Sequence, residues 1–244
     1  MQTLIWQFGT VVDKLQETSR TQSIAIDVPD WAGHKAGQHI DVRLTAEDGY
    51  QAQRSYSIAS PPEEPRVWIT VERLDDGEVS SYFTDELRTG DRIELRGPVG
   101  GYFTWDAQTA DSPLMLVAGG SGVVPLMAMI RHRSAAASRP PARLLYSSRS
   151  HEDIIYRAEI DRLVAVDSTL EVFHTLTRQQ PDGWTGFSRR IDRAMLEEVA
   201  WRSEERPDIF VCGPTQFVEV TATSLLELGH APGRIKTERF GPTG

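Results

Sequence analysis

As far as about Trp105, the chain consists of short segments in which apolar and polar side chains alternate. Clusters rich in glycine and aspartate, such as 47–49 and 75–77, separate these segments. Such alternation is typical of strands with one buried face, and the clusters are typical of turns between antiparallel strands. Six strands of this size would most easily close into a small barrel. We expect them in "TVVDKL", "QSIAIDV", "HIDVRLTA", "RSYSIAS", "RVWITVERL" and "RIELRGP".

From Leu114 onward, compact apolar runs alternate with helical stretches. The runs are "LMLVAG", "RLLYSS", "LEVFHTL" and "DIFVCG", and the helices are expected in "VPLMAMIRHRSAA", "EDIIYRAEIDRLVA", "RAMLEEVA" and "TQFVEVTATSLLELG". This order predicts a parallel sheet with helices on both faces, to which "RIKTERF" adds a last strand. We therefore expect two domains, an antiparallel barrel in residues 1–108 and an α/β domain in 109–244.

Composition narrows the classes of function. The 244 residues carry a formal charge of -9, with a pI near 5.2, so the long-range field opposes binding to nucleic acids and anionic membranes. A single cysteine, Cys212, excludes an internal disulfide and a four-thiolate metal site, and the six histidines lack metal-site spacing. There is no signal-like start and no apolar window near the roughly 20 residues that span a bilayer. We expect a soluble cytoplasmic protein without a metal.

A glycine-rich loop follows the first apolar run of the second half. Gly119, Gly120, Ser121 and Gly122 lead into a helix whose first turn accommodates Pro125. A backbone without Cβ atoms lets a pyrophosphate approach the start of a helix, although the third glycine of the dinucleotide fingerprint is missing. A P-loop would need lysine, and a hydrolase elbow would need another glycine. A plain turn is the alternative.

Candidate binding residues also follow the second and fourth apolar runs. At the end of the second strand in such a sheet, an arginine accommodates the 2′-phosphate of NADPH, so Ser148 and Arg149 favour that coenzyme. Glu152 and Asp153 lie close downstream, so NADH is still a possible coenzyme. The other interpretation of Arg149 is a solvated arginine on a loop. Cys212 is either a small buried apolar residue or a group placed against a reacting ring.

In order, these motifs resemble those of the ferredoxin–NADP reductase family over nearly the whole chain. The matching residues are Arg54, Tyr56 and Ser57; Gly77, Val79 and Ser80; Gly97, Pro98, Gly100 and Phe103; Gly119 to Pro125; and Cys212 to Pro214. The resemblance implies a flavin-binding barrel followed by a Rossmann-like nicotinamide-nucleotide domain. It also implies hydride transfer from NADPH or NADH to a flavin.

The resemblance assigns a role to each matching residue. Arg54 would pair with the flavin pyrophosphate, Tyr56 would lie against the isoalloxazine, and Ser57 would bond near its reactive nitrogen. The catalytic residues would be Ser57, Cys212 and Glu238. The other cofactor contacts would come from Ser55, Gly77, Val79, Ser80, Ser81, Gly120, Ser121, Gly122, Pro125, Ser148, Arg149, Gly213, Pro214 and Phe240. The family favours FAD over FMN, although no aromatic suited to stacking an adenine is evident in the barrel.

The acceptor of the electrons follows from what the chain lacks. Related oxygenase reductases continue past a similar "ERFG" stretch into an iron–sulfur domain, whereas here Phe240 is followed by only four residues. We therefore expect a separate one-electron acceptor, such as a ferredoxin or an oxygenase or metalloenzyme component. An acidic carrier would need a basic landing patch, to which residues 131–133 or 188–193 could contribute. The other interpretation of both segments is a solvated helix face. The alternatives are a flavin relay subunit of a larger oxygenase system and a simple nicotinamide-dependent dehydrogenase, which would leave the barrel motifs unexplained.

Overall fold

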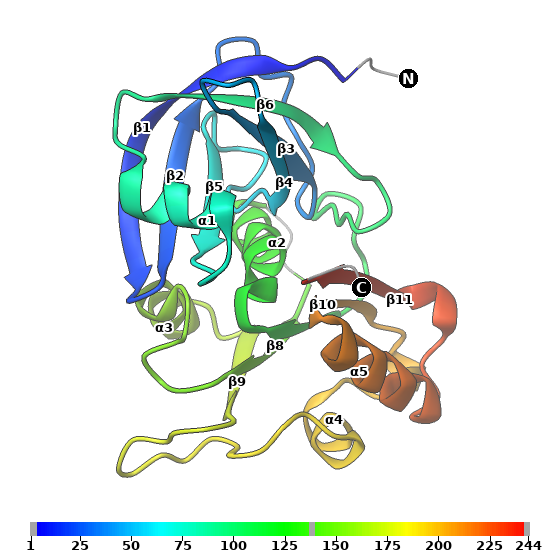
Figure 1. Ribbon diagram of the computed structural model, residues 1–244. Coiled ribbons are helices and arrows are strands. Elements are labelled where there is room, and N and C mark those ends of the chain that lie inside the picture. The colour runs from blue at the N-terminus through cyan, green and yellow to red at the C-terminus, as the bar shows by residue number, and fades with distance from the viewer. Residues whose placement is uncertain (1–3, 137–139, 242–244) are drawn as a thin grey trace. The chain divides into compact units, whose positions relative to one another are not determined.

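The computed structural model describes residues 4–136 and 140–241 (Figure 1). Two compact units are distinguished by their internal contacts. One contains the residues up to Asp106 together with Met127–Ala135, and the other contains Ala107–Leu126 together with the residues from Ala136 onward. The last residues of the expected tail, 242–244, lie outside the described part of the chain.

The first unit is built on a six-stranded antiparallel sheet, as predicted. Its strand order is β4-β3-β6-β1-β2-β5. An antiparallel bridge between Ile58, which follows β4, and Ile69 in β5 joins the two edge strands and closes the sheet into a barrel. The strands are β1 (Gln7–Thr18), β2 (Thr21–Asp27), β3 (His39–Thr45), β4 (Gln51–Ser57), β5 (Val67–Glu72) and β6 (Arg92–Val99).

Branched aliphatic side chains from all parts of this sheet form the barrel core. Ile24, Ile40, Ile69 and Leu95 come from four different strands and are fully buried. Each such burial contributes about 1.5–3 kcal/mol relative to exposure. A short helix α1 (Glu78–Ser81) and a π-helical turn η1 (Tyr82–Glu86) pack on the same core through buried side chains that include Phe83.

The second unit contains a five-stranded parallel sheet, also as predicted. Its order is β11-β10-β7-β8-β9, so the first strand along the chain lies in the middle. Strand β7 is buried along its whole length, which explains its continuous apolar run. The strands are β7 (Leu114–Gly119), β8 (Ala142–Ser148), β9 (Leu170–Leu176), β10 (Asp208–Pro214) and β11 (Ile235–Phe240).

Four longer helices connect or follow these strands. They are α2 (Val123–Ala135), α3 (Arg157–Val166), α4 (Arg193–Val199) and α5 (Thr215–Glu227), with short 3-10 turns η2 (Gly120–Gly122), η3 (Ser203–Glu205) and η4 (Pro232–Arg234). Helices α4 and α5 share a core with β7, β8 and β10. Helix α3 begins later than expected because Tyr156 adopts a left-handed conformation, with φ of 60°.

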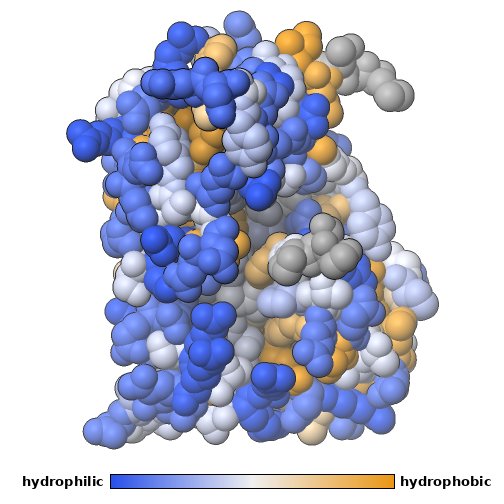
Figure 2. Space-filling view, in the orientation of Figure 1, coloured by the Kyte–Doolittle hydropathy of each residue, from blue (hydrophilic) through white to orange (hydrophobic). Residues whose placement is uncertain are grey.

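Hydrophilic side chains predominate on the face seen in Figure 2. None of the helices within residues 4–136 and 140–241 combines the length and the apolar character that crossing a membrane requires.

Candidate functional site

Strand β4 presents two side chains of the predicted site on one face. Arg54 and Tyr56 are two positions apart, and successive strand residues alternate between faces. The Tyr56 ring is half-buried and lies with its centroid 5.7 Å from that of Phe83 in η1. Burial raises the pKa of the Tyr56 phenol, so the hydroxyl stays protonated at neutral pH.

Arg54 is exposed and suited to binding an anion. Its guanidinium donates to the carbonyl oxygen of Gln53 at 2.6 Å, and within the described residues it has no carboxylate partner. A guanidinium offers five donors, and the planar fork matches phosphate oxygens. The exposed charge beside Tyr56 therefore leaves donors available for a phosphate group.

The two serines of the same strand point to the other face. The Ser55 hydroxyl donates to Asp41 at 2.6 Å, and the same carboxylate accepts a bond of 2.9 Å from Arg96. The structure therefore does not bring the Ser55 hydroxyl together with Tyr56. Ser57 is half-buried at the end of β4, where it pairs with His39 in β3.

The segment around α1 uses its hydroxyls to hold its own turn. Ser80 is buried, and its hydroxyl donates to the carbonyl oxygen of Gly77 and accepts from the amide of Leu74, both at 3.1 Å. Ser81 donates to the carbonyl oxygen of Glu78 at 3.0 Å. No side chain caps the start of α1, so its first amides are the groups that can receive an anion. Val79, in contrast, is buried in the barrel core, where its side chain cannot reach a ligand.

In the second unit, the loop from β7 to α2 needs its glycines for different reasons. Gly120 has a φ of +56°, and a Cβ there would meet nothing within 4 Å, which leaves open space above the backbone. A Cβ on Gly122 would lie 2.2 Å from the carbonyl oxygen of Cys212, so the loop packs directly on β10. Ser121 is half-buried between them, whereas Pro125 is buried in the first turn of α2.

The end of β8 carries the residues predicted to select the coenzyme. Within the described chain, the Ser148 hydroxyl is buried and has no hydrogen-bond partner, as expected for a group that a ligand completes. Arg149 follows and is exposed. Its carbonyl oxygen accepts bonds from the amides of Arg178 at 2.9 Å and Gln179 at 3.1 Å.

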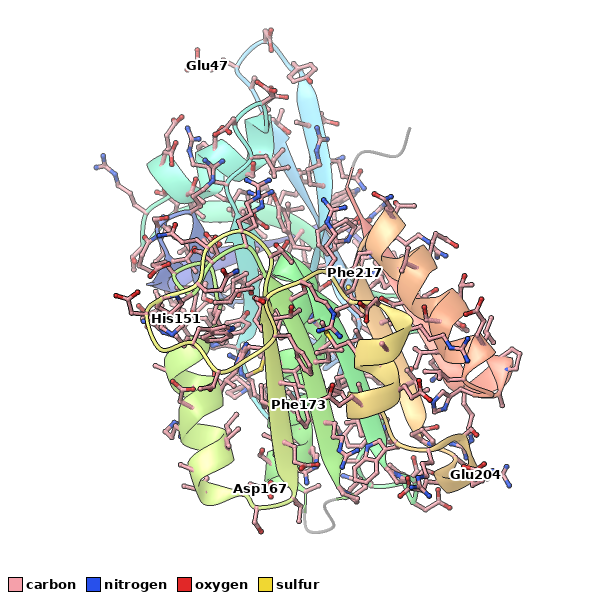
Figure 3. All side chains as sticks on the ribbon, turned by 90° about the horizontal axis from the view of Figure 1, so that it is seen from below. Glu47, His151, Asp167, Phe173, Glu204 and Phe217 are labelled. Atoms are coloured by element: carbon pink, nitrogen blue, oxygen red, sulfur yellow. The ribbon has the colours of Figure 1, made fainter. Side chains whose placement is uncertain are left out.

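This contact brings a second exposed arginine, Arg178, to the same loop cluster. Sequence reasoning missed Arg178. The available signal was its position just after β9, because the carboxyl ends of adjacent parallel strands meet at one edge of a sheet. His151, labelled in Figure 3, lies on the loop between β8 and α3.

Cys212 and Glu238 are direct neighbours in the parallel pairing of β10 and β11. Burial raises the pKa of the Glu238 carboxyl to about 7. Burial, and then the nearby Glu238 charge, raise the pKa of the Cys212 thiol, which therefore stays protonated. Cys212 is a buried thiol, and Glu238 is a carboxyl that can hold a proton near neutral pH.

Phe217 explains why glycine follows Cys212. A Cβ on Gly213 would lie 2.6 Å from the Phe217 ring. Figure 3 shows Phe217 beside the parallel sheet. Pro214 then precedes α5, and it pairs with the half-buried Phe240 at the end of β11.

The predicted basic patch at 131–133 is wrong. Arg133 is fully buried and His132 is 4% exposed, so neither forms part of a surface. Arg131 donates to the carbonyl oxygen of Ala59 at 2.6 Å, and His132 lies 2.7 Å from Glu63. These side chains stabilise packing within the first unit. A helix face that carries charged residues in the sequence can be buried when those residues form hydrogen bonds or ion pairs.

The second patch, 188–193, does lie on the surface. Arg189 and Arg190 are exposed, although Arg189 pairs with Asp192 at 2.9 Å. Its role in docking stays a prediction.

Two family models match the chain. The oxidoreductase FAD-binding domain matches residues 9–104, and the oxidoreductase NAD-binding domain matches residues 116–223. The open space at Gly120 and the Ser148 hydroxyl, which has no hydrogen-bond partner among the described residues, fit a nicotinamide coenzyme. The Arg54 guanidinium, without a carboxylate partner in the same part of the chain, fits the pyrophosphate of FAD.

Curated relatives and solved structures agree with these matches. The glycine betaine monooxygenase reductase subunit of Chromohalobacter salexigens is 34% identical over 237 residues, which are 95% of this chain and 63% of that protein. Ferredoxin–NADP reductase B of Sorangium cellulosum is 32% identical over 211 residues, which are 84% of this chain and 85% of that protein.

Solved structures show the same fold at lower identity. The FAD/NAD-binding domain of nitric oxide dioxygenase from Vibrio cholerae has a TM-score of 0.85 at 24% identity, covering 97% of this chain and 99% of that one. A ferredoxin NADP+ reductase from Neisseria gonorrhoeae, with bound FAD and NADP, has a TM-score of 0.82 at 20% identity, covering 96% and 98%. The chain therefore belongs to the ferredoxin–NADP reductase family and contains its FAD-binding and NAD-binding oxidoreductase domains.

Proposed function

We propose that this chain takes a hydride from NADPH onto FAD and passes the electrons singly to a separate acceptor protein. The observation that carries the proposal is the match of both a FAD-binding and a NAD-binding domain in one chain. We assign residues 1–108 to flavin binding and 109–244 to coenzyme binding. When bound, the flavin accepts a hydride and releases electrons one at a time.

In the barrel, Arg54 and the first amides of α1 bind the flavin pyrophosphate. The exposed guanidinium has no carboxylate partner within the described residues, and the α1 amides have no side-chain cap, which supports this role. Tyr56 provides a neutral aromatic face, because burial keeps its phenol protonated. Ser57 offers a hydroxyl at the end of the same strand.

In the second unit, Arg149 and Arg178 bind the 2′-phosphate of NADPH. Two guanidinium groups on backbone-bonded loops support this choice, since NADH carries no charge there. The Ser148 hydroxyl completes its hydrogen bonding on the same ligand. The open space at Gly120 admits the coenzyme pyrophosphate to the start of the following helix.

Glu238 and Cys212 complete the catalytic set. A carboxyl with a pKa of about 7 can retain or release a proton at neutral pH. The Cys212 thiol stays neutral, so it contributes apolar packing and excludes water.

The acceptor is proposed from two relatives. One is a ferredoxin–NADP reductase, and the other is the reductase subunit of a glycine betaine monooxygenase. A second candidate function is therefore an electron-transfer subunit of a larger oxygenase system. The chain spans 63% of the length of that oxygenase reductase relative.

Anaerobic mixing with NADPH tests the main proposal. We expect the yellow protein to bleach with NADPH, whereas a colourless protein, or one inert to both NADPH and NADH, contradicts it. Arg149→Ala and Arg178→Ala should each weaken NADPH binding by about 1.5–3 kcal/mol and leave NADH nearly unchanged. Arg66→Ala, an exposed arginine of the barrel, is the control. An equal loss for both coenzymes would remove the reason for preferring NADPH.

A further inference from the structure

The second unit has a pocket of about 160 Å³ that is lined by residues of two segments, 203–207 and 229–234. These segments lead directly into β10 and β11, which are parallel neighbours, so the pocket lies at the amino-terminal edge of the sheet. The residues proposed to bind the coenzyme, in contrast, lie at the carboxyl ends of β7 and β8. Figure 3 shows Glu204 at the same end of this sheet as Asp167, which precedes β9. The pocket is therefore separate from the coenzyme site.

Arg206 brings an unpaired positive charge to this pocket. The residue is exposed, and within the described part of the chain its guanidinium forms no ion pair and no hydrogen bond. Its backbone is left-handed, with a φ of 53°, which is uncommon for a residue other than glycine. Residues held in such a conformation are concentrated at ligand sites, where the surrounding structure offsets the strain. The turn before β10 thus keeps an arginine where a glycine would fit with less strain.

His230 is a second group without a partner at the pocket. It is only 5% exposed, and its ring has no hydrogen-bond partner among residues 4–136 and 140–241. Burial lowers the pKa of the imidazole by more than the nearby Glu204 charge raises it, so the ring is neutral at pH 7 and offers one N–H donor. Buried polar side chains normally have a hydrogen-bond partner. A ligand in the pocket would supply the partner that the protein does not.

The charges at the pocket favour an anion. Arg234 also lines it, and its guanidinium binds the Asp208 carboxylate at 2.6 Å and the Ser112 hydroxyl at 3.4 Å. Asp208 offsets the charge of Arg234, whereas the charge of Arg206 is not offset by an ion pair with any described residue. The described residues that line the pocket include two arginines and no carboxylate. An anion therefore gains attraction from Arg206 without meeting a negative side chain in the lining.

The placement of the donors indicates the shape of the anion. Ser203 and Arg206 come from the turn before β10, and His230 and Arg234 come from the segment before β11. A tetrahedral oxyanion presents oxygens in four directions, whereas a carboxylate presents two in one plane. Donors on separate segments are therefore better matched by phosphate or sulfate, with the guanidinium fork contacting two of the oxygens. The volume is well below the roughly 300–1,000 Å³ of sites for drug-sized ligands, so a nucleotide does not fit.

We propose that this pocket binds a small tetrahedral oxyanion, of which inorganic phosphate and sulfate are the simplest. Its oxygens accept hydrogen bonds from Ser203, Arg206, His230 and Arg234. The bound ion connects the turn before β10 with the turn before β11 and so stabilises the pairing of these two strands. The site does not depend on the proposed function, because the coenzyme is assigned to the opposite edge of the sheet.

NMR of the His230 ring, after backbone assignment of the full chain, tests this. The protein is titrated with sodium phosphate or sodium sulfate at constant pH and constant ionic strength. We expect both anions to shift the ring signals saturably, and sodium chloride and sodium acetate to leave them unchanged. AMP carries a phosphate on a body too large for the pocket and should also leave them unchanged. The signal is local, so phosphate that binds at the coenzyme site does not contribute to it.

Substitutions of Arg206 measure its contribution. Arg206→Ala should raise the dissociation constant for phosphate about tenfold, or about 1.4 kcal/mol, because a charge-assisted contact is lost. Arg206→Gly favours the left-handed turn and should weaken phosphate binding as much, with a more stable backbone. Arg162→Ala removes an exposed arginine of α3 in the same unit and should leave the constant unchanged.

Circular dichroism of each variant establishes that it is folded. A wild-type His230 signal that does not respond saturably to phosphate or sulfate would overturn the inference, and so would an equal response to chloride, acetate or AMP. Unchanged phosphate affinity in folded Arg206→Ala or Arg206→Gly would also overturn it, as would an equal loss in Arg162→Ala. Failure of NADPH to bleach a flavin would contradict the proposed function and would leave these results unaffected.

Discussion

The carboxyl of Glu238 gives a quantitative test of the second unit, by comparing the wild-type chain with Glu238→Gln across pH. Glu238 pairs with Cys212 across β10 and β11, and burial raises its pKa from 4.5 to about 7. Desolvation disfavours the charged carboxylate in the folded state but not in the unfolded chain. Glutamine keeps the shape of the side chain and carries no charge at any pH.

The direction and size of the change in unfolding free energy with pH follow from the difference between the folded and unfolded pKa of Glu238. A carboxyl whose folded pKa is raised stabilises the fold fully below the unfolded pKa, and this stability is lost as pH rises through the folded pKa. A shift from 4.5 to about 7, at 1.36 kcal/mol per pH unit, corresponds to about 3.4 kcal/mol. About 2.5 kcal/mol of this stability is lost as the pH rises from about 5 to about 8.5.

Urea unfolding of both proteins without ligands, at several pH values, measures the effect. The chain has two compact units, so each curve is fitted with two transitions, and only that of the parallel-sheet unit should differ. Relative to Glu238→Gln, the wild-type free energy of unfolding should fall by about 2.5 kcal/mol across that range. Titrating groups that do not contact Glu238 are common to both proteins and cancel, and burial, the larger cause of the raised Cys212 pKa, is also common to both. Parallel pH profiles for the two proteins would refute the reasoning.

Two further predictions concern backbone packing. Gly122→Ala would place a Cβ 2.2 Å from the carbonyl oxygen of Cys212 and should destabilise the second unit by about 3 kcal/mol in thermal unfolding. Gly120→Ala, whose Cβ would meet open space, should cost only about 1–2 kcal/mol. Equal costs for the two variants would contradict this prediction. Asp192 caps α4 by accepting from the amide of Met195 at 2.8 Å, so Asp192→Ala should cost about 1 kcal/mol in urea unfolding, and an unchanged midpoint would refute the cap.

Several features of the candidate site could be predicted because they depend on neighbours in sequence. The alternation in β4 places Arg54 and Tyr56 on one face whatever the rest of the chain does. The glycine-rich loop is likewise predicted by a strand followed directly by a helix. The resemblance of these motifs to those of the family then predicted a flavin in the barrel and a nicotinamide coenzyme in the second unit.

Other features depend on segments that meet only in three dimensions. Arg178 joins Arg149 because two loops hydrogen-bond, although 29 positions separate them in the sequence. The Ser55 hydroxyl is committed to Asp41 on the neighbouring strand. The residues around each partner do not determine such pairings, because one short sequence is compatible with many conformations of the backbone.

The sequence by itself determined the element order, the antiparallel barrel and the parallel sheet, because their periodicities of apolar residues are local and strong. Only the tertiary structure decided that Arg133 is buried, that His230 lines a pocket, and that Glu238 loses its hydration beside Cys212. Burial is a property of all the segments packed around a side chain. A residue's neighbours in the sequence therefore cannot fix its exposure or its pKa.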